Sequence, residues 1–453
     1  MGTALNAAAQ REVIYIDPDA KPTDLFEAFK QEETWQLDQV AFTNRMKNCG
    51  FRFLDAKKSA ATTTLRQLIN FMGNTVYEAR VFFANNKLRR AEFSLFNKGD
   101  ADRQLNEEAL NGMIKKLRDG LDTALEQKGM AGRTAKPRPN YVQQRFQWTK
   151  SNPAVQLEWA YVEAHRSNGK NVPYNAEFVK VLMVPLTGSS VQDKAALTGE
   201  GILAKAKKLS QLRQSVQKDE NGDVWIDGIP MVDQGQKGYC AAASSERLLR
   251  YYGIEVDEHQ IAQLANTSAA GGTSLAGMAM AISKVGRHYQ LDVKSLIGVE
   301  DGKDFLKSDT MKLIEQYNST AKKSNKPTID WRQFHSTAGI EVMAIYGAMD
   351  KELLLQTRMR AKQQFAAFQR NVKQYIDAGI PMLWACFVGM YPEDPPLGQQ
   401  GAFGHMRMII GYNTKTHEII YSDTWGARHE KKRMPENQAW AMTKGLTIMR
   451  PRM

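Results

Sequence analysis

The sequence predicts an α+β protein with two parts of different character. Residues 1–190 combine several short strand patterns with one clear amphipathic helix, which is typical of an antiparallel sheet with a helix on one face. From Val224 onward the pattern changes to a helix rich in small residues, further helices and then apolar strands. At 453 residues the chain is long enough for two or three domains with separate cores. We therefore expect an N-terminal α+β domain over 1–190, a helical linker over 191–224 and a second domain over 225–453.

A hairpin and a helix are the clearest elements of the N-terminal part. Residues 75–84 and 88–96 are rich in β-forming residues, and the turn sequence Asn85-Asn86-Lys87 separates them. Over 107–126, leucine and isoleucine recur every three or four residues and form one apolar stripe. Three further strands are expected at 145–149, 155–164 and 177–184. No group of residues in this part points to catalysis.

The second part is expected to hold helices first and strands afterwards. In chain order its elements are a strand at 225–232, helices at 241–253, 275–284 and 351–378, and strands at 382–388, 406–412, 418–422 and 446–449. Between residues 300 and 350 the pattern predicts only short helices and loops. Gly379 and Pro381 form the usual stop signal after the long helix.

The charge of the chain is strongly positive, with a net value of +12. Its lysines and arginines are spread along the whole length, and the densest cluster, between Lys205 and Arg213, accompanies apolar residues at helical spacing. That arrangement is typical of the solvated face of an amphipathic helix, and no zinc-finger or RNA-binding motif accompanies it. We expect no nucleic-acid partner, and no membrane span because no run of 18 apolar residues occurs.

The start of the chain leaves the compartment open. Residues from Met1 to Gln10 lack the basic region and the apolar stretch of a signal peptide. If a signal peptide has been removed before them, the protein is extracytoplasmic or secreted, and otherwise it is cytoplasmic.

The three cysteines, Cys49, Cys240 and Cys386, are too few and too uneven for a disulfide framework. Cys240 stands where a glycine-containing loop becomes a helix. The unpaired N–H groups and the positive dipole end of a helix start favour the thiolate, which is the nucleophilic form. Cys386 lies in an apolar strand and Cys49 has no histidine nearby, so both are expected to be structural.

Three further residues complete a constellation with Cys240. Gln234, six residues earlier, could direct its amide N–H₂ group to the carbonyl oxygen that Cys240 attacks, and form an oxyanion hole with the Cys240 backbone N–H. His405 begins one expected strand and Asp423 follows the next, so an antiparallel pair would bring them together. A carboxylate beside an imidazole fixes its tautomer and favours the imidazolium. Each residue alone has an ordinary structural explanation, but the four together indicate nucleophilic catalysis.

No metal site and no cofactor are expected. The remaining histidines show no metal-ligand spacing, because His-Glu-x-x-His and paired Cys-x-x-Cys motifs are both absent. Gly271-Gly272 beside Thr273 and Ser274 is not followed by the Gly-Lys-Ser/Thr of a phosphate loop, so it is interpreted as a turn before a helix.

The order of these motifs resembles that of papain-like cysteine peptidases. Gln234 and Cys240 come first, His405 follows, and Asp423-Thr424-Trp425-Gly426 stands where that family has Asn-Ser-Trp-Gly. In the family this tryptophan covers the histidine and its orienting residue. The resemblance therefore implies that Trp425 covers His405 and Asp423. An Asp as third residue, Gly272-Thr273-Ser274 after the cysteine helix and Gly379-Ile380-Pro381 before a strand are similar to the bacterial double-glycine (bacteriocin-processing) peptidase-like branch. The resemblance covers about residues 225–453.

The resemblance implies a papain-like domain of two lobes, a helical lobe led by Cys240 and an antiparallel sheet lobe bearing His405 and Asp423. It implies cleavage of a peptide or protein substrate through a thioester on Cys240, without a cofactor. A helical insertion would occupy about 296–377. A transglutaminase-like acyl transferase or amidase shares the chain order and stays open, as does a non-catalytic peptide-binding module on a peptidase fold. A contact between the N-terminal domain and the catalytic cleft also stays open.

Overall fold

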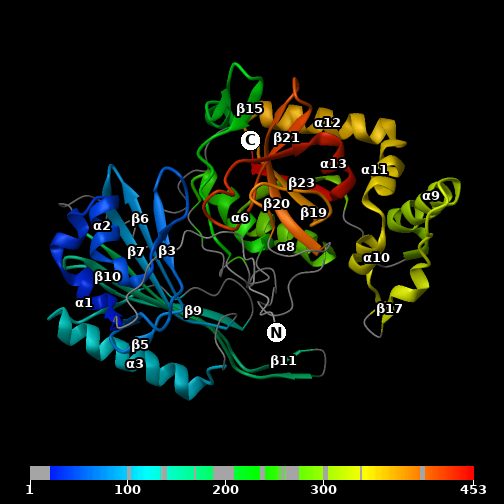
Figure 1. Cartoon of the computed structure of the whole chain (residues 1–453). Coiled ribbons are helices and arrows are strands. Elements are labelled where there is room, and N and C mark those ends of the chain that lie inside the picture. Colours follow the sequence, from blue (N-terminus) through cyan, green and yellow to red (C-terminus); the bar gives the residue numbers. More distant parts are fainter. Residues whose placement is uncertain are drawn as a thin grey trace, which may run out of the picture. The chain divides into compact units, whose positions relative to one another are not determined.

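The computed structural model describes most of the chain, in several segments. These are residues 21–98, 104–132, 134, 140–167, 170–186, 209–234, 240–254, 256, 261, 275–298, 305–336, 339–397 and 403–452. The described residues up to Leu186 form one compact unit and those from Leu209 onward form a second, and each is described by itself (Figure 1). The first part of the expected linker and the Gly272-Thr273-Ser274 stretch lie outside the described residues.

The N-terminal unit is built on an eight-stranded antiparallel sheet with the strand order β2-β3-β6-β7-β13-β10-β9-β8. Its strands are β1 (Thr23–Asp24), β2 (Arg52–Phe53), β3 (Ala60–Thr63), β4 (Ile69–Phe71), β5 (Asn74–Thr75), β6 (Glu78–Ala84), β7 (Lys87–Asn97), β8 (Met130–Ala131), β9 (Tyr141–Trp148), β10 (Ala154–Val162), β11 (His165–Ser167), β12 (Lys170–Val172) and β13 (Asn175–Val184). Its helices are α1 (Leu25–Lys30), η1 (Glu32–Gln36), α2 (Gln39–Arg45), η2 (Lys47–Cys49) and α3 (Glu107–Ala124).

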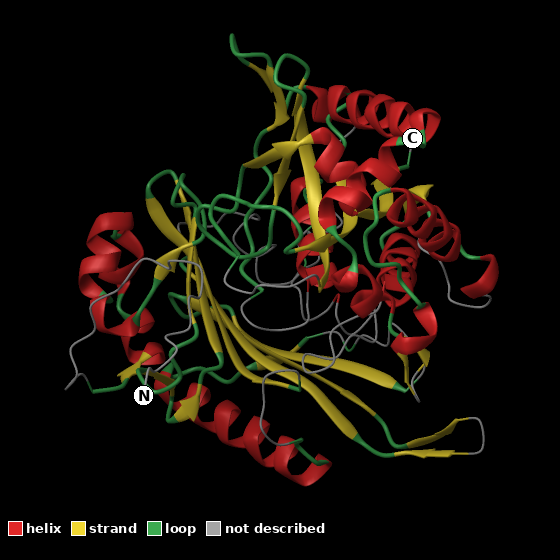
Figure 2. Cartoon of the chain, turned by 45° about the vertical axis from the view of Figure 1, so that its right-hand side comes forward, coloured by secondary structure: helices red, strands yellow, loops and turns green. Residues whose placement is uncertain are grey.

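The predicted hairpin and helix of this unit are both confirmed. Asn85 and Asn86 join β6 to β7 with φ angles of 52° and 57°, as a two-residue hairpin turn requires. The Asn106 side chain caps α3 by accepting a hydrogen bond from the Ala109 N–H at 2.9 Å. The apolar stripe of α3, which includes Leu110, belongs to the hydrophobic core that the sheet lines, and Figure 2 shows the helix running along the sheet. The short elements before β6 have no clear period and were not predicted.

The second unit is an antiparallel sheet surrounded by helices. Its strands are β14 (Val216–Lys218), β15 (Asp223–Ile226), β16 (Leu291–Ile297), β17 (His335–Ser336), β18 (Gly339–Ile340), β19 (Met382–Val388), β20 (Phe403–Asn413), β21 (Glu418–Ser422), β22 (Lys432–Pro435) and β23 (Thr443–Pro451). Its helices are α5 (Leu209–Arg213), α6 (Cys240–Tyr251), α8 (Leu275–His288), η3 (Phe305–Lys307), α9 (Asp309–Lys323), η4 (Trp331–Phe334), α10 (Val342–Ala348), α11 (Lys351–Met359), α12 (Lys362–Asp377) and α13 (Glu436–Met442). The main sheet has the order β14-β15-β20-β19-β23-β16, and β21 pairs with both β20 and β22. The mixed content of helix and strand confirms the α+β class.

The single long helix predicted over 351–378 is wrong, because the chain forms two helices there. α11 ends at Met359 and α12 begins at Lys362, with Ala361 at a non-helical ψ of 56° between them. α11 packs against α9 and α13, whereas α12 packs mainly against β20 and also contacts β15, β19 and α13. Two different packing surfaces therefore require a change of direction, and no glycine or proline announces it in the sequence.

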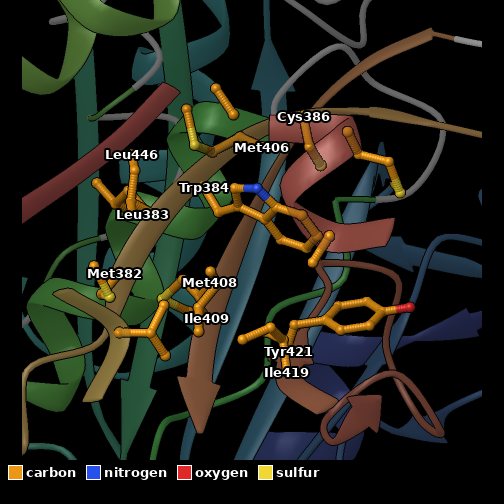
Figure 3. Packing of buried hydrophobic residues seen from close by; sticks show 14 of the residues in the cluster. Met382, Leu383, Trp384, Cys386, Met406, Met408, Ile409, Ile419, Tyr421 and Leu446 are labelled. Carbon is orange, nitrogen blue, oxygen red and sulfur yellow. The ribbon is translucent and has the colours of Figure 1, made fainter. Parts of the chain in front are cut away.

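The core of this unit lies around β19, in which all seven residues are buried. Trp384 of β19 meets the ring of Tyr421 of β21 edge-on, with centroids 5.7 Å apart (Figure 3). The Trp384 indole N–H donates to the Thr443 hydroxyl at 2.8 Å, which satisfies a polar group that burial would otherwise leave unpaired. The helices α6 and α12 both pack on β20. The fully buried strand β19 thus pairs with β20, which in turn packs against α6.

Candidate active site

Cys240 is the first residue of α6, so the cysteine does stand at a helix start. The three alanines that follow it, Ala241–Ala243, are all buried and let the helix lie close to its neighbours. One turn into the helix, the Ser244 hydroxyl donates to the backbone carbonyl of Met406 in β20 at 3.2 Å. Because Met406 directly follows His405, this bond sets the start of α6 against the part of the sheet that carries the histidine.

His405 lies in β20 opposite Cys386 of β19 and is 2 % exposed. Its Nε2 atom is 2.5 Å from Oδ1 of Asp423. Burial alone would lower the pKa of His405. The charge and hydrogen bond of Asp423, together with a hydrogen bond to Cys240, outweigh burial and raise the pKa of His405 to about 9. The imidazole is therefore protonated at neutral pH.

Asp423 follows the last residue of β21 and is completely buried. The antiparallel pairing of β21 with β20 brings it beside His405. Its Oδ1 atom also accepts a hydrogen bond from the Thr424 backbone N–H at 3.0 Å. Burial alone would raise the pKa of Asp423, but Arg407 and His405 hold this pKa well below its usual range. The buried carboxylate is thus ionised and aimed at the imidazole.

Trp425 covers one face of the imidazole. Its indole is stacked on the His405 ring, with centroids 4.2 Å apart and an interplanar angle of 6°. The next residue, Gly426, has a φ of +78°, and a Cβ atom there would lie 3.1 Å from Oδ2 of Asp233. Glycine meets both demands of this turn. The ring of His429 contacts the Trp425 indole edge-on, at 5.7 Å between centroids.

Gln234 is tied to the same turn by two hydrogen bonds. Its backbone N–H donates to the Thr424 carbonyl at 2.9 Å, and the Thr424 hydroxyl donates to its side-chain Oε1. Because Oε1 is the acceptor in that bond, the amide N–H₂ group is the end directed away from Thr424. The neighbouring Asp233 forms an isolated antiparallel bridge with Trp425. The structure therefore joins the Gln234 loop to the turn that bears Asp423 and Trp425.

Behind Asp423 lies a chain of buried charges that the sequence reasoning missed. Nε of Arg407 is 2.8 Å from Oδ2 of Asp423, at an angle outside that of a hydrogen bond, so charge rather than a directed bond joins them. The two terminal nitrogens of Arg407 donate to Glu393 at 3.0 and 2.9 Å. Lys432 and the Tyr421 hydroxyl donate to the same Glu393 oxygen at 2.9 and 2.7 Å. The one signal in the sequence is an arginine two residues after His405, on the same side of an otherwise apolar strand.

A second buried arginine connects α6 to this turn. Arg247 lies seven residues after Cys240, on the same face of the helix. Its Nη1 atom donates to the backbone carbonyl of Asp423 at 2.5 Å, and Nε donates to the Pro230 carbonyl at 2.8 Å. Burial lowers the pKa of Arg247 to about 10, so it remains charged at neutral pH. These bonds hold together the cysteine helix, the Asp423 turn and the segment at Pro230 that precedes Gln234.

The other two cysteines are packed in hydrophobic cores. Cys386 is completely buried beside His405, and burial raises the pKa of its thiol far above the ordinary value. Cys49 is 2 % exposed in the N-terminal unit, and burial raises its pKa as well. Raised thiol pKa values make both poor nucleophiles at neutral pH.

Within the described segments, no group of three or more His, Cys, Asp or Glu side chains is arranged to hold a metal ion. The helices among the same residues are all too short or too polar to cross a membrane.

Two family models match adjacent segments of the chain. Residues 228–315 match the model described as the Peptidase C39 family, and residues 316–448 match the one described as the Peptidase C39 like family. The first segment contains Gln234 and Cys240, and the second contains His405 and Asp423. No curated protein matches the chain.

Proposed function

Residues 228–448 match the models of the Peptidase C39 and Peptidase C39 like families, and from this premise we propose that the protein is a cysteine peptidase that hydrolyses peptide bonds through a thioester on Cys240. The observation that carries the proposal is the buried contact between His405 and Asp423, in which the imidazole is stacked under Trp425 and interacts electrostatically with the Cys240 thiol at the start of α6. In this proposal the cleft lies between a helical lobe led by α6 and the sheet that bears His405.

Acylation begins when the Cys240 sulfur, having given its proton to His405, attacks the carbonyl carbon of the scissile bond. The negative charge that develops on the carbonyl oxygen is stabilised by the Cys240 backbone N–H and the Gln234 amide N–H₂. The protonated His405 then gives its proton to the leaving amine, and the C–N bond breaks. Asp423 orients the ring and stabilises its charged form.

Deacylation reverses these roles. The neutral imidazole of His405 takes a proton from a water molecule, whose oxygen attacks the thioester carbonyl. The same two donors stabilise the second oxyanion. The C–S bond breaks, the acid product leaves, and the proton on His405 restores the resting pair with Cys240.

The proposal is tested by incubating the full chain with a peptide mixture and identifying new termini by mass spectrometry, with Cys240→Ala as the blank. Hydrolysis in ¹⁸O-labelled water should label the new carboxyl groups in the presence or absence of an added primary amine. Incorporation of the amine instead would indicate a transglutaminase-like acyl transferase. Peptide binding without cleavage, and without alkylation of Cys240 by a thiolate-directed reagent, would indicate a non-catalytic module.

Removal of the Gln234 amide should slow the chemical step. Gln234→Ala is expected to lower kcat by about 10²-fold to 10³-fold, the usual cost of one lost oxyanion donor. KM should change little, because this hydrogen bond is strongest in the transition state. Thr424→Val should give a smaller loss, since it removes only the hydroxyl that orients the amide. Gln369→Ala, in α12, is the matched control. An unchanged kcat with a raised KM would mean that Gln234 only binds substrate.

The dependence of kcat/KM on pH should be bell-shaped. The acid limb reports formation of the charged pair between thiol and imidazole, and the alkaline limb reports loss of the imidazolium proton. Because the pKa of His405 is raised to about 9, activity should persist through neutral pH and fall as the pH rises through that value. A profile that climbs to a plateau with no alkaline limb would show that His405 does not supply the proton.

A further inference from the structure

An ionised aspartate at this depth needs a permanent counter-charge. Asp423 has no exposed surface. Of its two carboxylate oxygens, Oδ1 faces His405 and Oδ2 faces Arg407. During the proposed cycle His405 is alternately charged and neutral, so it cannot balance Asp423 throughout. An uncompensated buried carboxylate would then take up a proton itself. Arg407 is charged at every stage, because a guanidinium does not titrate in this range.

The positive charge of Arg407 is itself balanced by the carboxylate of Glu393, on the side away from Asp423. Glu393 accepts both terminal nitrogens of Arg407, and Lys432 in turn donates to Glu393. Asp423, Arg407, Glu393 and Lys432 carry two negative and two positive charges, and their side chains are 0 to 1 % exposed. Other titratable groups act electrostatically on Asp423 or on His405: Arg247, His429, Cys386, Tyr421 and Cys240.

We propose that Arg407 is a positioning residue of the active site, which holds Asp423 charged and directed at His405 throughout the catalytic cycle, with Glu393 holding Arg407. The inference rests on the proposed peptidase function for its catalytic meaning. The chain of charges then sets how tightly the pair of His405 and Asp423 binds its proton. If the pair binds its proton more tightly, deacylation slows, because that step needs a neutral imidazole. If the pair binds its proton more weakly, acylation slows, because His405 is then less often protonated and able to give a proton to the leaving amine.

Two substitutions in the chain of charges should move this proton in opposite directions. Arg407→Met removes a cation from the pair, so the pair should bind its proton more tightly and the titration of His405 should move up by about one pH unit or more. Glu393→Gln removes an anion from behind Arg407, so the titration should move down, by less because the group is farther away. The measurement is the chemical shift of histidine labelled with ¹³C at Cε1, followed against pH in the full chain.

Two further variants separate this role from simple support of the fold. Arg407→Lys keeps the cation and should leave the titration near the wild-type value. Arg358→Met removes another buried guanidinium, which bonds to the carbonyls of Trp440 and Thr443, and should lower Tm without moving His405. Shifts of the same sign in Arg407→Met and Glu393→Gln, or no shift in either, would overturn the proposal. If Arg407→Met does not fold, the direction of the Glu393→Gln shift decides alone.

The titration needs no substrate, so it remains informative if the protein proves not to cleave peptides. Opposite shifts without any hydrolysis would retain the role of Arg407 and reject the proposed function. Hydrolysis without the opposite shifts would support the proposed function and reject the role of Arg407.

Discussion

Cys240→Ala is expected to abolish turnover while leaving the fold intact. Without the sulfur no acyl-enzyme forms, and loss of a nucleophile of this kind lowers kcat by about 10⁶-fold. Alanine suits the site, because three alanines already follow at the start of α6 and Cys240 packs in the same hydrophobic core. The loss of one buried sulfur atom should cost about 1 kcal/mol of folding stability. Peptide cleavage and Tm, measured on the same preparation, check both parts.

The other two cysteines are the natural controls for this result. Cys386→Ala and Cys49→Ala each remove a buried thiol from a hydrophobic core. Both should keep activity within a few-fold of the wild type, apart from some loss of stability. Equal inactivation by all three substitutions would contradict the assignment of Cys240 as nucleophile.

Asp423→Ala should have the second-largest effect on catalysis and should also destabilise the fold. The imidazole would lose its hydrogen-bond acceptor and its counter-charge, and loss of the orienting carboxylate in a comparable triad lowers kcat by about 10⁴-fold. Removal of one partner from a buried ion pair typically costs about 3 to 5 kcal/mol, and here Arg407 would be left with Glu393 alone. The measurements are kcat/KM against pH and the free energy of unfolding.

Asp423→Asn separates orientation from charge. Its amide oxygen can still accept the hydrogen bond from His405, so this variant should retain more activity than alanine does. Without the anion the imidazolium is less stable, and the alkaline limb should move below the value of about 9 that the wild type implies. Wild-type rates in Asp423→Ala across the whole pH range would remove Asp423 from the site.

The same proton links the site to stability. The pKa of His405 is raised in the folded state to about 9, against roughly 6.5 for an unperturbed histidine. Its contribution to stability is therefore fully present below pH 6.5 and is lost as the pH rises through 9. In Asp423→Asn most of this pH dependence should disappear, because the partner that raises the pKa has lost its charge.

Much of the sheet that carries the site could be predicted from the sequence. β19 and β21 have the predicted bounds, because each is a short apolar run between strong turn signals. The contact between His405 and Asp423 followed from one inference, that two consecutive strands joined by a short turn lie antiparallel. Trp425 and Gln234 were found only through their resemblance to a known order of motifs or through their distance from Cys240.

The parts that could not be predicted depend on contacts between distant segments. The break between α11 and α12 arises because each helix packs on a different surface, and the local sequence around Ala361 is helix-forming. Glu393 lies in a loop with no period, and its role appears only once Arg407, Lys432 and Tyr421 are placed around it. The sequence does carry a signal for Arg407, because its charge faces the same side of a strand as His405.

The bonds between Gln234 and Thr424 have a consequence for how the protein matures. The two residues are 190 positions apart, and the bridge between Asp233 and Trp425 spans a similar distance. No local stretch of chain can assemble these contacts, and closing such long loops comes late in folding. A partly folded chain can therefore form the complete helix α6 and still lack the contacts of Gln234 and Asp233 with the Asp423 turn, which the proposed mechanism requires. If the proposed function holds, this order of assembly would protect the unfolded segments of the chain from cleavage by its own active site.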